Sequence, residues 1–265
     1  MSKNNAFLLG ALVATQLVTV SPAYGMSNQE MNITSIKQNY TVEEAFTFDN
    51  ETGTILDYDY KIGGKEVNIP PTIAGVTVKK IADRAFMKKQ LTKVTIPSGV
   101  TTIGNRAFSG NRLTSLTLPN TLTTIGSSAF SNNKLTSLTL PDSVKTIGFS
   151  AFSNNRLTNL SLPNGLTTVK SDSFSYNSLT NLTLPNSVTT IENDAFSHNK
   201  LTNLTLSNQL IYIGSSAFAN NNLSKLDLPN TLETIDDYAF ENNQLYGMII
   251  PSGVKNVGKD IFGRK

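Results

Sequence analysis

Hydrophobic and polar positions follow one another along most of this chain in a pattern that repeats every 22 residues. Residues 113–156 contain the pattern twice in succession. A column of phenylalanines runs with the same period: Phe86, Phe108, Phe130, Phe152, Phe174, Phe196, Phe218, Phe240 and Phe262. A fixed period of this length indicates stacked repeats, in which each unit buries its apolar side chains against its neighbours.

The first half of each unit predicts a short strand. In the unit that begins at Leu113, the apolar Leu116 and Leu118 flank the polar Thr117, which is the period-two alternation of a half-buried strand. Pro119 follows and ends the strand, because proline has no N–H to donate to a ladder. Stacked units therefore place their strands side by side as a parallel sheet.

The second half of the unit has a different spacing. Leu122, Ile125, Ala129 and Phe130 are three or four residues apart, which predicts turns and short helical segments on the other side of the coil. The unit closes with Asn132. Asparagine tolerates a left-handed backbone and bonds nearby backbone groups, so it suits a turn.

A second asparagine column ends the units, one residue later: Asn111, Asn133, Asn155, Asn177, Asn199, Asn221 and Asn243. The full pattern, L-x-x-L-x-L-P-x-x-[LV]-x-x-I-G-x-x-A-F-x-x-N, resembles the BspA-like bacterial leucine-rich repeats. It covers about residues 69–262 in nine copies, although Thr121 stands where general leucine-rich repeats have an asparagine. The resemblance implies a leucine-rich repeat solenoid, mostly β, in a secreted or surface protein that binds or adheres. It implies no chemistry and no cofactor.

The N-terminal residues divide into three expected segments. Lys3 and an apolar run up to Val20 predict a secretory signal peptide over residues 1–25, cleaved near Gly25, with residues 21–23 as an alternative site. Residues 26–44 are polar and predict a flexible lead-in. No second apolar run follows and the chain has no cysteine, so we expect neither a membrane span in the mature chain nor disulfides.

Residues 45–68 predict a β-hairpin that caps the solenoid of residues 69–265. Two apolar runs flank an Asn- and Gly-containing turn, and the first coil needs a cover for its leucines. Asp57 and Asp59 in this hairpin are better explained as a solvated strand face than as a cation site, because no further acidic ligands accompany them.

Positive charge is concentrated in one part of the array. Residues 79–156 contain eleven Lys or Arg against two acids, a net charge of +9. Arg112, Lys134 and Arg156 occupy one column, so stacking aligns them as a ridge, with three more lysines close in sequence: Lys88, Lys89 and Lys93. This predicts a first contact for an anionic glycan of a host or a cell wall. The alternative is a solvated edge that discourages sheet aggregation.

Residues for catalysis or metal binding are few. The single histidine, His198, occupies a turn column that accepts many residue types. Glu192 with Asp194, and Asp236 with Asp237, are the carboxylate pairs available for polysaccharide hydrolysis, and solvated charges explain both. No phosphate loop, nucleotide fingerprint or zinc spacing is present. We therefore expect no enzyme, no cofactor and no nucleic-acid partner.

The outward positions of the predicted strands are mostly hydroxyls and amides. They form three columns, typified by Thr136, Ser137 and Thr139. The chain has no tryptophan, and hot spots of protein interfaces favour Trp, Tyr and Arg. A threonine ladder at this spacing is compatible with ice or carbohydrate in geometry, but β-propensity and solubility explain it as well.

The last strand departs from this pattern. Tyr246 and Ile249 stand at outward positions where other units have Thr or Ser, and the final coil ends soon after Phe262. We expect this end to dock a second copy, end to end, or another partner. Three function classes follow: a secreted or surface binding and adhesion module for protein or glycan, favoured by the resemblance; a self-associating scaffold; and, distantly, a polysaccharide-active enzyme.

Overall fold

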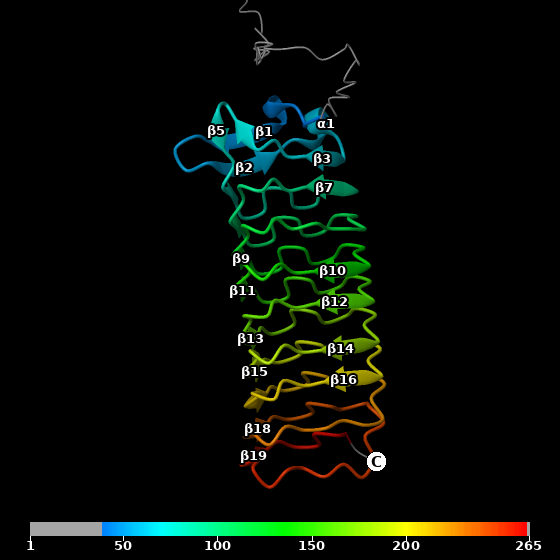
Figure 1. Cartoon of the computed structure of the whole chain (residues 1–265). Helices are drawn as coiled ribbons and strands as arrows, with labels where there is room; N and C mark the ends of the chain where they lie inside the picture. The colour runs from blue at the N-terminus through cyan, green and yellow to red at the C-terminus, as the bar shows by residue number, and fades with distance from the viewer. Residues whose placement is uncertain (1–38, 264–265) are drawn as a thin grey trace, which may run out of the picture. The chain divides into compact units, whose positions relative to one another are not determined.

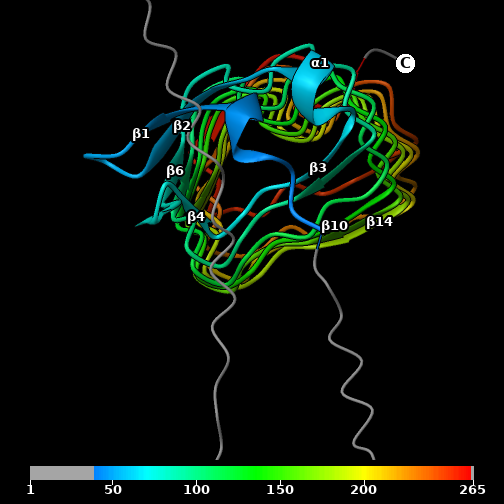
Figure 2. The same cartoon turned by 90° about the horizontal axis from the view of Figure 1, so that it is seen from above.

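The computed structural model describes residues 39–263, which form a β solenoid of stacked coils (Figure 1). The expected signal peptide and residues 26–38 of the expected lead-in lie outside the described residues. Viewed down the stack, the coils nearly superpose, so equivalent residues lie above one another in columns (Figure 2). The structure confirms the expected mostly-β repeat solenoid.

One side of the coils, here called the strand face, carries three-residue strands centred on an apolar residue. They are β3 (Glu66–Asn68), β7 (Lys93–Thr95), β10 (Ser137–Thr139), β12 (Asn159–Ser161), β14 (Asn181–Thr183) and β16 (Asn203–Thr205). They pair in parallel as β3 with β7, β10 with β12, and β14 with β16. The register is one whole repeat, with Leu138 opposite Leu160.

The other side of the coils carries a second parallel sheet, made of two-residue strands. They are β6 (Lys80–Ile81), β8 (Thr102–Ile103), β9 (Thr124–Ile125), β11 (Thr146–Ile147), β13 (Thr168–Val169), β15 (Thr190–Ile191), β17 (Tyr212–Ile213), β18 (Thr234–Ile235) and β19 (Asn256–Val257). The ladder runs from β6 to β11 and again from β13 to β19. From β6 to β18 each strand buries its β-branched second residue and turns the first outward, which suits a pleated surface, whereas Val257 of β19 is exposed.

The short helical segments expected on this side are absent from the described coils, and that detail of the prediction is wrong. Helix in residues 39–263 is limited to η1 (Glu43–Ala45) and α1 (Tyr60–Gly63) near the N-terminal end. After each two-residue strand the chain makes single turns, such as Ala107 N–H to Gly104 O at 3.3 Å. Arg106, inside this turn, has φ 56°, and a left-handed residue stops the turn from continuing as a helix.

The N-terminal residues add a hairpin to the second sheet. Strand β1 (Phe46–Asp49) pairs antiparallel with β2 (Thr54–Tyr58), and β2 pairs in parallel with β6. The buried Tyr58 ring lies 5.0 Å from the ring of Phe86, the first member of the phenylalanine column. Two further short strands, β4 (Thr72–Ile73) and β5 (Val76–Thr77), pair antiparallel within the longer first coil. The first coil is thereby covered by apolar side chains of the hairpin.

The phenylalanine column forms the centre of the core, as predicted. The rings from Phe86 to Phe240 are fully buried and stack nearly parallel, with neighbouring centroids 4.8 Å apart at Phe86–Phe108 and 5.7 Å apart at Phe152–Phe174. Leucine, isoleucine and valine columns surround them in one continuous cluster. Each unit therefore obtains its core only from its neighbours.

The second asparagine column ties adjacent coils together through buried hydrogen bonds. The Asn133 Nδ2 donates to Phe108 O at 3.0 Å and to Phe130 O at 3.1 Å, and its Oδ1 accepts from Leu113 N at 3.1 Å. One side chain thus satisfies backbone groups of two coils. The preceding residue, Asn132, has φ 56°, so the two asparagines divide the roles of backbone partner and left-handed turn.

Candidate functional site

The outward hydroxyls of the strand face fall into two groups. In the first column, Thr158 Oγ1 donates to Thr136 O at 3.2 Å, and Thr202 Oγ1 donates to Thr180 O at 3.2 Å. These hydroxyls satisfy backbone carbonyls of the preceding coil. The third column, typified by Thr139, makes no side-chain hydrogen bond among the described residues, so its hydroxyls are the ones available to a ligand.

Shallow hollows lie beside this third column. The largest, about 530 Å³, includes Thr205, Leu206 and Asn208 from one coil and Asp227 and Pro229 from the next. Two others, of about 450 and 300 Å³, occupy equivalent positions elsewhere in the array. Sequence reasoning found the hydroxyl columns but not these hollows.

The ridge of Arg112, Lys134 and Arg156 lies at the beginning of the strand face, and all three residues are exposed. Their backbone amides donate to the carbonyls of the preceding coils; for Lys134 the acceptor is Leu113 O at 2.9 Å. The three side chains are therefore held one coil apart, a spacing of about 4.8 Å. None of the ion pairs found within residues 39–263 includes any of them.

The three lysines close to the ridge differ in how freely their charges can contact an anionic ligand. Lys88 is exposed and lies over Gly110, in a column next to the ridge. Lys93 is exposed on β7 and pairs in register with Glu66 of β3. Lys89 Nζ lies 3.0 Å from Asp57 Oδ1 of the hairpin, so its charge is already balanced by a carboxylate. That same contact gives Asp57 a cationic partner.

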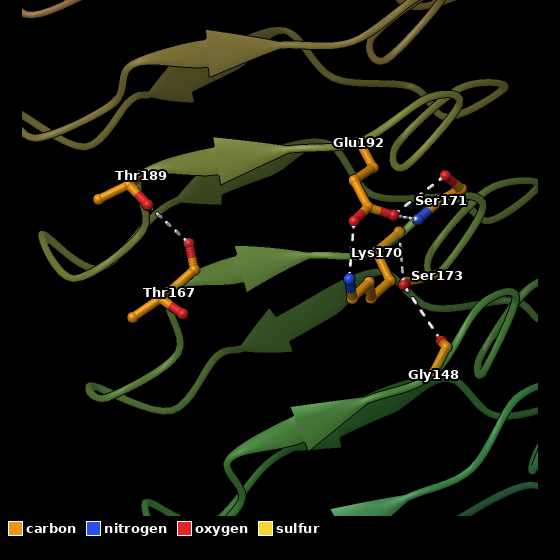
Figure 3. Close-up of polar contacts among 7 residues, drawn as sticks. All are labelled: Gly148, Thr167, Lys170, Ser171, Ser173, Thr189 and Glu192. Carbon is orange, nitrogen blue, oxygen red and sulfur yellow. Dashed lines mark hydrogen bonds and ion pairs between the residues drawn. The ribbon is translucent and has the colours of Figure 1, made fainter.

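The carboxylate of Glu192 is held by its neighbours (Figure 3). Lys170 Nζ lies 2.8 Å from Oε1, while the Ser171 amide and hydroxyl donate to Oε2 at 3.0 and 3.2 Å. Burial by itself raises the pKa of Glu192, but the bonds from Lys170 and Ser171 outweigh it and hold the pKa below its ordinary value. This carboxylate is suited to structural bonding, since it is charged and fully engaged.

The other candidate acids have different partners, so they do not act together as a catalytic pair. Asp236 accepts a hydrogen bond from the Tyr212 hydroxyl, and this bond together with burial raises the pKa of Tyr212 to about 12. Asp237 accepts from the Lys259 amide at 2.7 Å. Burial, with the neighbouring Asp172 carboxylate, raises the pKa of Asp194. Within residues 39–263 no group of three or more metal-ligating side chains occurs.

His198 lies in an exposed stack of flat side chains. Its ring packs parallel to the ring of Tyr176, with centroids 4.2 Å apart, and His198 has φ 53°. Asn220 Nδ2 lies 3.4 Å from its Nε2 on the other side. The sequence assigned this histidine to a turn column, and the structure shows a side chain stacked at that turn, with no carboxylate of residues 39–263 hydrogen-bonded to its ring.

Phe149 is an exposed aromatic that sequence reasoning did not single out. It is 52% exposed, in a column held by Ser127 and Ser171 in the adjacent coils. The Lys170 Nζ lies 5.7 Å from the ring centroid. The signal was present in the sequence, as one phenylalanine outside the regular column at an otherwise polar position.

Tyr246 and Ile249 are 75% and 85% exposed, the largest values among the exposed large hydrophobic side chains in the described residues. A hollow of about 380 Å³ lies beside Tyr246, lined also by Leu245, Met248 and Phe262. Phe262 stacks on Phe240 with centroids 6.0 Å apart. The expected docking residues are therefore accessible, next to apolar side chains of the last coils.

The family model described as the BspA type leucine-rich repeat region matches residues 79–201 and 145–265, with 6 copies. The chain belongs to this family. The Phe, Asn and Leu columns described above are therefore the repeated positions of the BspA-type repeat. In the described residues, no helix has the length and apolar character needed to cross a membrane.

Three solved structures of bacterial proteins share this fold. A leucine-rich repeat protein from Bacteroides ovatus superposes with a TM-score of 0.59 at 24% identity, over 82% of this chain and 66% of that one. The pneumococcal vaccine antigen PcpA gives 0.52 at 25% identity, over 79% and 74%. A leucine-rich cell surface protein from Faecalibacterium prausnitzii gives 0.50 at 22%, over 82% and 71%. No curated protein matches the chain.

Proposed function

We propose that this BspA-type chain is a secreted or cell-surface binding module that holds an anionic glycan of a host or a cell wall along its basic ridge. The observation that carries the proposal is the ridge of Arg112, Lys134 and Arg156: three exposed cations in register, without a carboxylate partner among the described residues. The apolar N-terminal run of the sequence supports export.

A row of cations with this spacing suits a polymer better than a single small anion. Each side chain makes a weak, solvent-screened contact, but several contacts on one polymer act together, because the second becomes intramolecular once the first has formed. Lys88 and Lys93 lie in neighbouring columns and widen the row. Lys89 contributes less, since Asp57 already balances its charge.

The test is retention of the folded mature chain on heparin and on an anionic cell-wall polymer. We expect the triple variant Arg112→Gln, Lys134→Gln, Arg156→Gln to elute at markedly lower salt than the parent chain. Binding of the parent should weaken steeply with ionic strength, since exposed charges are screened over about 8–10 Å.

A matched control removes the same charge from the opposite sheet. Lys79, Lys80 and Lys145 are exposed and belong to the same basic part of the chain, but they lie in or beside the two-residue strands. Their triple Gln variant should bind nearly as well as the parent. Equal losses in both variants would show that net charge alone is responsible, and the ridge proposal would fail.

Self-association through Tyr246 and Ile249 is the second candidate, favoured by the exposure of these two side chains. In this proposal the last coils of one copy dock on a second copy, which buries both residues. Light scattering should then show a mass that rises with concentration in the parent. The Tyr246→Ser, Ile249→Thr variant should remain monomeric; a parent chain that stays monomeric throughout would refute the proposal.

A further inference from the structure

The backbone ladder of the strand face is interrupted at every second coil in the middle of the array. Where it is intact, Leu140 N donates to Ser161 O at 3.1 Å, and Leu184 N donates to Thr205 O at 3.0 Å. The equivalent amides of the alternate coils are those of Leu118, Leu162 and Leu206. Within the described residues, these three amides donate no hydrogen bond to the next coil. The strand pairs β10–β12 and β14–β16 are therefore separated from one another.

The burial of the strand leucines follows the same alternation. Leu138 and Leu182, at the centres of β10 and β14, are buried. The equivalent leucines of the coils with the unbonded amides are only partly buried: Leu116, Leu160 and Leu204. These strands thus stand slightly farther out from the core.

The corner that follows each strand offers a cause. Its buried apolar residue alternates in size, with Val144 and Val188 in the coils with recessed strands. In the coils with outward strands the same buried position holds leucine: Leu122, Leu166 and Leu210. An extra methylene in a packed core displaces its surroundings, and here the strand moves outward. The coil of Val100 is an exception, because its Ile96 amide is also unbonded. The coil of Leu232 is another, because its strand residue Leu226 is buried although the corner holds leucine.

A hollow lies at each of the three interruptions, two coils apart. The first includes Leu116, Thr117 and Leu118 of one coil with Ser137, Thr139 and Pro141 of the next. The second has a similar composition around Leu162. The third lies around Leu206 and has the charged Asp227 where the first has Thr139. We call these three hollows the slots.

We propose that the slots bind a linear, uncharged polysaccharide that runs along the strand face. In each slot a backbone N–H and the carbonyl it would otherwise meet are not bonded to each other, as with Leu162 and Thr183. A hydroxyl group is both donor and acceptor, so one sugar hydroxyl can bridge the two. The third-column hydroxyls and the asparagine amides supply further partners, while leucine and proline supply apolar contact.

The spacing of the slots favours a polymer. Two coils correspond to about 9.6 Å along the stack, from a strand spacing of about 4.8 Å. A linear glycan whose sugars alternate in orientation presents the same edge at every second sugar, so one chain can place equivalent hydroxyls in successive slots. Each shallow slot alone binds weakly. When one glycan chain occupies two or three slots, the later contacts are intramolecular and the overall affinity rises.

This proposal is independent of the basic ridge. The slots lie at the end of the strand and the ridge before its beginning, and the second slot has no charged lining residue. Slot binding should therefore be nearly unchanged between low and high salt, whereas ridge binding should not. Either proposal can fail without affecting the other.

The experiment uses the folded mature chain and uncharged β-1,4-linked oligosaccharides of glucose and of N-acetylglucosamine, with binding followed by NMR chemical shifts. Oligosaccharides long enough to reach two slots should bind at least about tenfold more tightly than those that cover only one. Shifts should concentrate at Thr139, Thr183 and the Leu162 amide. An extended proline-rich peptide serves as the competing class of ligand.

Two substitutions test the slots themselves. Thr183→Arg fills the second slot with a long side chain, while Thr190→Arg adds the same group on the opposite sheet; only the first should weaken binding, by about tenfold for a two-slot ligand.

Leu166→Val should let the strand of Leu160 recede and close the second slot, which would restore protection of the Leu162 amide against hydrogen exchange.

Absence of binding by both glycans at millimolar concentration would overturn the proposal, as would equal binding by Thr183→Arg and the parent. Preference for the peptide over both glycans would also reject it. If Leu166→Val leaves the Leu162 amide unprotected, the assigned cause of the slots is wrong; if the amide becomes protected and glycan binding persists, the slots are not the binding site.

Discussion

At the scale of the residue, this fold depends on side chains that each serve two coils. A buried phenylalanine such as Phe152 stacks on rings above and below, and a buried asparagine such as Asn133 bonds backbone groups of its own coil and the preceding one. Loss of one side chain therefore damages two interfaces. Neither type of column is easily replaced, because the spacing between coils is set by the backbone ladder.

Phe152→Ala should lower the free energy of unfolding by about 3–5 kcal/mol, the usual cost of truncating a fully buried ring. Phe152 is fully buried, and its ring centroid lies 5.4 Å from that of Phe130 and 5.7 Å from that of Phe174. Urea denaturation measures the change. The exposed Phe149→Ala is the matched control, with an expected cost below about 1 kcal/mol; similar losses in both variants would contradict the assigned core.

Asn155→Ala should cost about 1–3 kcal/mol, since it leaves buried backbone groups unpaired. The Asn155 Nδ2 donates to Phe130 O and Phe152 O, and Oδ1 accepts from Leu135 N. Asn154→Ala is the adjacent control, because Asn154 is exposed and serves as the left-handed turn residue. A larger loss at Asn154 than at Asn155, measured by urea denaturation, would reverse the roles assigned to the two asparagines.

Glu192→Gln should destabilise the chain near neutral pH and have little effect in acid. The folded state holds the pKa of Glu192 below its ordinary value, so its charged form stabilises the fold above the unfolded-state pKa of about 4.3, and this contribution disappears as the pH falls through the lower folded-state pKa. The partly exposed pair with Lys170 suggests a loss of about 0.5–1 kcal/mol at neutral pH. Urea denaturation at several pH values checks it; a loss that persists unchanged in acid would show that the charge is not responsible.

At the scale of the element, close approach of adjacent coils limits which residues can follow each two-residue strand. A Cβ added at Gly126 would lie 2.6 Å from Asn105 N, on backbone that cannot move freely. Lys170, Glu192 and Asp236 occupy the same column in other coils, so the array can adjust to a side chain there at some cost.

Gly126→Ala should therefore lower the free energy of unfolding by about 1–3 kcal/mol, in the range of overpacked sites. Gly165→Ala is the control, because its added Cβ would meet only the flexible end of Lys145, at 3.1 Å. Removal of glycine entropy from the unfolded chain should make that variant neutral or more stable by up to about 1 kcal/mol. Thermal melts of the two variants compare them directly, and equal melting temperatures would show that the coils are less tightly apposed at Gly126.

The sequence predicted the elements that a fixed period aligns, and missed those that depend on small differences between repeats. Phe152 and Asn155 could be assigned because every coil has the same residue at that position. The strand of Thr146 and Ile147 could not, since two alternating residues do not distinguish a strand from a turn. The alternation of Val144 and Leu166 is visible in the sequence, but its effect on the ladder becomes apparent only in three dimensions.

The candidate site was predictable to the same extent. Alignment of Arg112, Lys134 and Arg156 follows from the period alone. The pairing of Lys89 with Asp57 does not, because the hairpin lies outside the repeat and its register against the coils is not encoded by any column.

At the scale of the whole molecule, the array is a sequence of coil interfaces that differ in their number of backbone bonds. In the second sheet the ladder stops between β11 and β13, and on the strand face it stops between β12 and β14. The coil of residues 157–178 therefore has an interrupted ladder on each side, one in each sheet. In a solenoid, stability is approximately a sum of units and nearest-neighbour interfaces, so weak interfaces determine where the array opens.

The last prediction follows from these interruptions. The array should open first at the coil of residues 157–178, so that the coils before it and the coils after it behave as two separate cooperative units. The amides of Leu162, Thr167 and Lys170 make no backbone bond to an adjacent coil, whereas the equivalent amides of Leu184, Thr189 and Glu192 are bonded. Native-state hydrogen exchange should show low protection at the first three and high protection at the second three. The Phe column and the buried Asn177 still link this coil to its neighbours, so opening should be local at low denaturant and become global only when those contacts break. Uniform protection across both sets of amides would mean that the interruptions do not divide the array into separate cooperative units.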